Sequence, residues 1–139
     1  MKILIIVAVL IAILVGIMYF FPQINFREMP KGLENGQLPE EKPNWVSSLV
    51  ATNNSHYIAP LKINSLEKLS ACINTKIPEI KLTQITTTSL IGYRQSPVFH
   101  FVDWFSINHK GMVVSTATMG RSDFGKNRQL IEKIRALCA

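Results

Sequence analysis

The stretch VFHFVDWFSINHKGMVVSTATM, residues 98–119, decides the fold of this chain. Two runs rich in β-branched and aromatic residues, Val98–Ile107 and Met112–Met119, flank the tetrapeptide Asn108–Gly111. Runs of this composition favour strands, and a short polar segment that ends in glycine favours a tight turn between them. The stretch therefore predicts two neighbouring antiparallel strands joined as a hairpin.

Further strand and helix patterns lie on both sides of this hairpin. Ile80–Thr87 and Ser89–Gln95 have the same β-branched character and predict two more strands. Upstream, Asn64 and Glu67 make a capping-box pattern, followed by apolar residues at helical spacing: Leu66, Leu69, Ile73 and Ile77. The apolar period returns over Lys126–Cys138. We therefore predict an α+β fold, an antiparallel four- to five-stranded sheet covered by two helices.

The N-terminal segment differs from the rest of the chain. Ile3–Phe21 contains no charged residue, and at a rise of 1.5 Å per residue a helix of this length covers most of a hydrocarbon core of about 30 Å. Bulky residues, Met18–Phe21, stand where a cleaved signal peptide has small ones. We therefore expect residues 1–21 to form an uncleaved transmembrane signal anchor, whose helix ends at Pro22.

The remaining residues are predicted to form a linker and one soluble domain. Residues 22–42 carry prolines, glycines and mixed charges without an apolar period, which indicates a linker before a domain over residues 43–139. Long domains translocate largely regardless of flanking charges. We therefore expect a single-pass protein of the inner (cytoplasmic) membrane, with its C-terminal domain in a bacterial periplasm.

The charge of this domain limits the class of partner. Residues 43–139 hold eleven Lys or Arg and five Asp or Glu, and a basic balance favours anionic surfaces such as lipid headgroups. We expect the bilayer as a partner through residues 3–21, and a protein or an anionic lipid as a further partner of the domain. The chain has no nucleic-acid-binding motif, so we expect no nucleic acid partner.

Asp103 interrupts an apolar strand face. A period of two places it among four apolar residues: Phe99, Phe101, Phe105 and Ile107. Because a buried carboxylate without a partner is costly, we expect Asp103 to pair with a base, the candidates being Arg94, Arg121, Arg128 and His56. Two interpretations remain open, a structural ion pair and a general base. The second would make the protein a small hydrolase or transferase that uses His56 and Asp103.

Four segments have the order and spacing of a known family. They are PNWVSS (residues 43–48), HYIAPL (56–61), FVD (101–103) and GRSDFGKNR (120–128). Together they resemble the domain of unknown function 1499 family over about residues 43–139. The resemblance implies an envelope or organelle-lumen location and no established activity.

The last of these segments leads into the C-terminal helix and allows two interpretations. Helical projection places Asn127 on the inward-facing arc, where its amide can satisfy the loop while Asp123 or Ser122 caps the helix. Alternatively, the amides at the helix start can bind an anion such as a lipid phosphate, together with Arg121 and Arg128. These five residues are the predicted ligand-binding candidates.

The cysteines and histidines carry the remaining predictions. Cys72 and Cys138 lie on or beside the inward arcs of the two predicted helices, and two cysteines in an oxidising compartment favour a disulfide over two buried thiols. The histidines, His56, His100 and His109, lack the spacing of metal ligands. We therefore predict a Cys72–Cys138 disulfide, no metal and no cofactor, and a function by binding rather than by catalysis.

Overall fold

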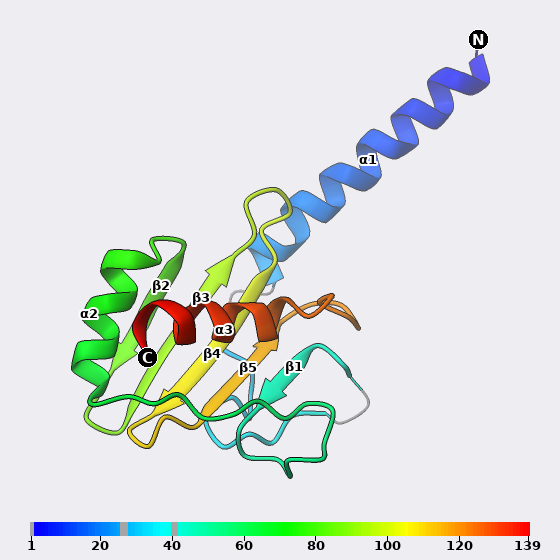
Figure 1. The fold of residues 1–139 in the computed structure, drawn as a ribbon. Helices are drawn as coiled ribbons and strands as arrows, with labels where there is room; N and C mark the ends of the chain where they lie inside the picture. Colours follow the sequence, from blue (N-terminus) through cyan, green and yellow to red (C-terminus); the bar gives the residue numbers. More distant parts are fainter. Residues whose placement is uncertain (1, 26–27, 40–41) are drawn as a thin grey trace.

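The computed structural model describes residues 2–25, 28–39 and 42–139. In these residues it contains three helices and five strands (Figure 1). The helices are α1 (Lys2–Asn25), α2 (Leu66–Lys76) and α3 (Lys126–Cys138). The strands are β1 (Trp45–Ser47), β2 (Ile80–Ile85), β3 (Ser89–Gln95), β4 (Val102–Asn108) and β5 (Val113–Ala117). The predicted α+β fold is confirmed.

The strands form one antiparallel sheet in the order β1-β5-β4-β3-β2. The four strands expected from the sequence follow one another as a meander, each beside the next. The fifth, β1, lies at the edge, where Trp45 is opposite Thr116 of β5. Its three residues are too few to show a period of two, so the sequence did not predict it.

The hairpin between β4 and β5 is confirmed. Asn108 Oδ1 accepts hydrogen bonds from the N–H groups of Lys110 and Met112 at 2.9 and 3.0 Å. Gly111 has a φ of +78°, and a Cβ at this position would lie 2.0 Å from the Leu61 carbonyl oxygen. The turn therefore requires glycine here, both for its backbone conformation and for this close approach.

The beginning of β4 differs from the prediction. The strand starts at Val102, so Phe99 and Phe101 precede it. Residues 96–101 instead form a turn, in which the Ser96 hydroxyl accepts the N–H of Phe101 at 2.9 Å. His100 has a φ of +56°, outside the range of a strand. The predicted strand over residues 98–107 is therefore wrong in its first four residues, because a local side-chain hydrogen bond stabilises a turn there.

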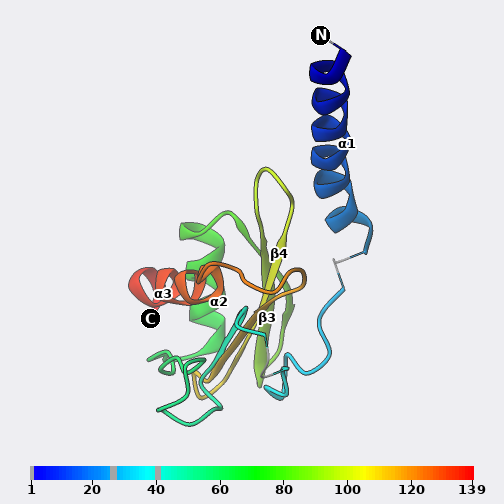
Figure 2. The same cartoon turned by 90° about the vertical axis from the view of Figure 1, so that its right-hand side faces the viewer.

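The main core lies between the sheet and the two C-terminal helices, which cover the same face (Figure 2). Its fully buried side chains come from α2, β3, β4, β5 and α3, and include Ile73, Leu90, Phe105, Ile107, Val113, Leu130, Ile131 and Ile134. The predicted disulfide joins the two helices: the Cα atoms of Cys72 and Cys138 are 5.7 Å apart. This pairing confirms that both cysteines face the contact between α2 and α3.

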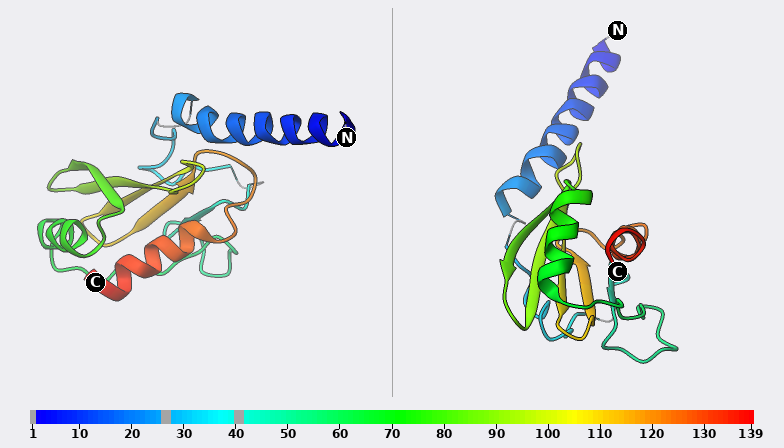
Figure 3. Two further views of the ribbon diagram at one scale, coloured as in Figure 1. Left: turned by 90° about the horizontal axis from the view of Figure 1, so that it is seen from above. Right: turned by 60° about the vertical axis from the view of Figure 1, so that its left-hand side comes forward.

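The opposite face of the sheet carries a second, smaller core. Leu33 is fully buried there, against four residues of the sheet: Ile91, Val102, Trp104 and Val114. Seen from above, the sheet lies between α3 and α1 (Figure 3). Part of the segment expected to be a linker therefore packs against the sheet.

Two helix boundaries differ from the sequence analysis. α1 continues through Pro22 to Asn25, three residues beyond the expected end. α2 begins at Leu66, and its cap is Ser65 rather than Asn64: the Ser65 hydroxyl accepts the N–H of Lys68 at 3.2 Å. A serine one residue later is an equally good cap and places Leu66 in the buried first turn.

Candidate functional site: two cavities at the start of α3

The loop between β5 and α3, residues 118–125, borders two cavities. The larger has a volume of about 730 Å³ and lies between this loop and the turn that joins β3 to β4. The smaller has a volume of about 160 Å³ and lies between the loop, Trp45 and His56. Asp123 lines both cavities. The two cavities therefore share one wall at the beginning of α3.

The larger cavity contains an ion pair between neighbouring strands. Arg94 of β3 lies opposite Asp103 of β4, and its guanidinium nitrogen is 2.7 Å from Asp103 Oδ2. The two side chains are 19% and 11% exposed. The same guanidinium nitrogen lies 3.3 Å from the carbonyl oxygen of Lys126, in the first turn of α3. The prediction that Asp103 is buried and pairs with a base is confirmed. Because Arg94 also donates to the Lys126 carbonyl, the pair connects α3 to the sheet.

Replacing Asp103 with Ala is expected to lower the free energy of unfolding by about 1–3 kcal/mol, because it leaves the largely buried Arg94 guanidinium without its carboxylate. A matched control is Glu132→Ala, which removes the carboxylate of a more exposed pair with Arg135. That change should cost less than about 1 kcal/mol. If the Asp103→Ala and Glu132→Ala variants gave the same urea unfolding curve, this result would contradict a structural role for Asp103.

The same carboxylate predicts a pH dependence. Burial raises the pKa of Asp103, although the hydrogen bond and charge of Arg94 oppose the shift. At pH values between the ordinary aspartate pKa of about 3.9 and the raised pKa, Asp103 therefore holds a proton more often in the folded state than in the unfolded chain. The free energy of unfolding should fall as the pH rises through this window. In an Asp103→Asn variant, this part of the pH dependence should be absent.

The smaller cavity contains His56, but its imidazole is occupied by structural contacts. The ring stacks on Trp45 with centroids 3.7 Å apart, and Nδ1 lies 2.9 Å from the Trp45 carbonyl oxygen. Arg128 also lines this cavity, and it donates to the carbonyl oxygens of Ser55 and Tyr57 at 3.1 and 2.8 Å. Arg128 therefore holds the segment that follows β1 against α3, and His56 holds the same segment against Trp45 of β1.

The structure does not bring the two residues of the catalytic alternative into one cavity. His56 lines the smaller cavity, whereas Asp103 lines the larger one and is bound by Arg94. Within residues 2–25, 28–39 and 42–139, no group of three or more His, Cys, Asp or Glu side chains is placed to hold a metal ion. The described residues therefore do not place His56 and Asp103 together as one catalytic pair.

The loop before α3 has the arrangement of a helix cap. Asp123 Oδ2 accepts from the backbone and side-chain nitrogens of Asn127, both at 2.7 Å, and Oδ1 accepts from Gly125 at 3.1 Å. The Ser122 hydroxyl accepts the N–H of Phe124 at 3.2 Å. A carboxylate at this position satisfies the positive end of the helix. An anion could therefore bind these amides only if it displaced the Asp123 carboxylate or lay next to it. Anion binding by Arg121 and Arg128 stays a prediction.

Asn127 extends this cap into a buried network. It is fully buried, donates to the Asn44 carbonyl oxygen at 3.0 Å and accepts from the Ser115 hydroxyl at 2.6 Å. Asn44 in turn donates to the carbonyl oxygen of Gly120 at 2.8 Å. The network joins the segment before β1, the strand β5, the loop and α3. It brings together the first and the last of the four sequence segments that the resemblance rests on.

Comparison with known proteins identifies one family. The model of a family described as "Protein of unknown function (DUF1499)" matches residues 37–137. The matched range contains all five strands, α2 and all but the last residue of α3. No curated protein and no solved structure matches the chain.

Proposed function

The chain belongs to the DUF1499 family of proteins of unknown function, and we propose that it is a single-pass protein of the inner membrane whose residues 43–139 form a periplasmic domain that works by binding. In this proposal α1 is the anchor, and the larger cavity is the binding site. The ligand class is a protein segment or a lipid near the membrane surface.

The properties of α1 support membrane attachment. The span Lys2–Phe20 has a mean hydropathy of 3.2, and none of it is buried against the rest of the protein. A helix that is apolar on all sides and has no protein around it needs a lipid environment. The disulfide between α2 and α3 supports an oxidising compartment for the domain, since such bonds persist outside the cytoplasm.

The observation that carries the proposal is the position of the larger cavity next to the end of α1. The ring of Tyr19 lies 4.6 Å from the ring of His100, in the turn between β3 and β4. Met18 lines the larger cavity. If α1 spans the bilayer, its last aromatic residues lie at the interface, so the cavity would face the membrane surface.

An intact mass of the purified protein tests whether the anchor is kept. We expect the protein to stay in the membrane pellet after alkaline carbonate extraction and to have the mass of a chain that includes residues 2–25. The physical reason is that bulky residues, not small ones, follow the apolar core. A mature N-terminus between residues 22 and 28, with the domain released by carbonate, would contradict the proposal.

A further inference from the structure

We infer that the larger cavity binds a membrane amphiphile, with its acyl chain between the β3–β4 turn and the loop before α3 and an anionic head group at Lys126. The inference rests on the proposed membrane attachment and names the ligand class of the same site. Three observations carry it: the lining of the cavity, the apolar surface around it and the distribution of charge.

The lining is suited to an acyl chain. Apolar side chains from α1, the β3–β4 turn and the loop before α3 form the walls, namely Met18, Pro97, Phe101, Met119 and Phe124. A volume of about 730 Å³ is within the range of small-molecule sites. Such sites combine apolar walls with a few polar groups that fix the ligand, and here these groups are Arg94, Asp103 and Lys126.

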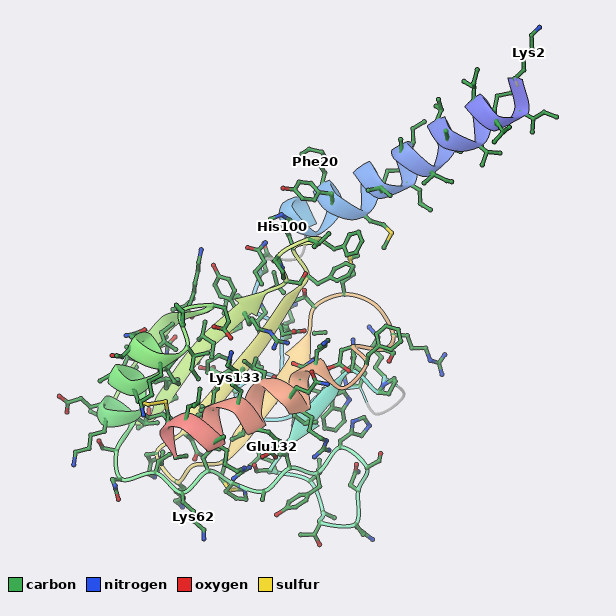
Figure 4. The ribbon with its side chains drawn as sticks, turned by 45° about the horizontal axis from the view of Figure 1, so that its top comes forward. Lys2, Phe20, Lys62, His100, Glu132 and Lys133 are labelled. Carbon is green, nitrogen blue, oxygen red and sulfur yellow. A yellow bond between two sulfur atoms is a disulfide. The ribbon has the colours of Figure 1, made fainter. Side chains whose placement is uncertain are left out.

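The apolar surface continues from the cavity towards α1. Phe124 is 88% exposed in the loop before α3, and Val98 is 61% exposed in the β3–β4 turn. Figure 4 shows His100, in the same turn, beside Phe20 near the end of α1. Neighbouring exposed apolar residues usually mark a surface that meets a partner. Because this surface adjoins the end of the proposed membrane span, that partner is the bilayer and its lipids.

One cation of the described cavity lining, Lys126, is not part of an ion pair and is the candidate contact for an anionic head group. Arg94 and Asp103 neutralise each other, Glu79 pairs with Lys133, and the Asp123 oxygens accept three hydrogen bonds at the start of α3. Among the described lining residues, Lys126 has no carboxylate partner, and its ammonium lies 3.4 Å from the side-chain oxygen of Gln129. A carboxylate or phosphate of an amphiphile would complete this site.

The test is photolabelling of the full chain in phosphatidylcholine nanodiscs. One arm adds trace palmitic acid with a diazirine on its chain, and the other adds phosphatidylglycerol labelled in the same way. We expect crosslinks to residues 95–103 and 117–126 in addition to α1. The probe that labels these residues more efficiently shows whether the ligand is a free fatty acid or a phospholipid. Crosslinks to α1 alone, from both probes, overturn the inference and leave membrane attachment standing. Absence of label from α1 overturns the attachment itself.

Two pairs of variants locate the site. Ala117 lines the cavity opposite Asp103, so Ala117→Trp should remove the label from the domain, whereas Ala136→Trp at an exposed position of α3 should not. Lys126→Glu should reduce labelling by both anionic probes, while Lys62→Glu, an exposed residue outside the cavity, should not. Because Lys126 is exposed, its replacement tests the head-group contact even if Ala117→Trp does not fold. Equal labelling of Lys126→Glu and wild type would overturn the head-group site.

Discussion

Breaking the Cys72–Cys138 bond is expected to lower the free energy of unfolding by about 4 kcal/mol. The bond closes a loop with a sequence separation of 66 residues and so removes much conformational freedom from the unfolded chain. It also fixes the end of α3, because Cys138 is the last residue of that helix and helix ends fray. Urea unfolding of a Cys72→Ser, Cys138→Ser double variant measures the effect.

Reduction of the wild-type protein is the matched control for this variant. Wild type with a reductant should unfold at the same urea concentration as the double variant, and the variant should not respond to the reductant. If the double variant were as stable as the oxidised wild type, the bond would not stabilise the contact between α2 and α3.

Replacing Asn127 with Ala is expected to cost about 3 kcal/mol or more. The change removes one hydrogen bond each from the Ser115 hydroxyl, the Asn44 carbonyl and the Asp123 carboxylate. The Ser115 hydroxyl and the Asn44 carbonyl then keep one backbone partner each. Because Asn127 is fully buried, water cannot replace these bonds without opening the structure. The effect should appear both in urea unfolding and as faster amide exchange at the start of α3.

Gln129→Ala on the same helix is the control. Gln129 is exposed, so its replacement should change the free energy of unfolding by no more than about 0.5 kcal/mol. Equal stability of the Asn127 and Gln129 variants would show that the buried network does not hold the loop to the sheet.

The fold was predictable where a local pattern repeats. The four strands of the meander follow from runs of β-branched and aromatic residues, and both C-terminal helices follow from an apolar period of 3.6. The hairpin follows from Asn108 and Gly111. The prediction failed where one side chain decided the backbone conformation. Ser96 stabilises a turn at residues 96–101, and Ser65 rather than Asn64 caps α2.

The candidate site was only partly predictable. The ion pair of Asp103 and the capping role of Asp123 follow from the cost of burying a carboxylate and from the helix start. The bond between Asn127 and Asn44 spans 83 positions in the sequence, and no local pattern signals such a contact. The larger cavity was also missed, because its walls come from separate elements. An aromatic residue in the loop before α3, Phe124, was the available signal.

The central claim is that the domain lies outside the cytoplasm on a membrane-spanning α1, and labelling of single added cysteines tests it most directly. Lys62 lies at the end of the domain away from α1, and Lys2 lies at the free end of α1 (Figure 4). In intact spheroplasts a membrane-impermeant maleimide should label a Lys62→Cys variant without permeabilisation. A Lys2→Cys variant should react only after the membrane is opened. The reverse pattern, or labelling of both variants only after permeabilisation, would contradict the account.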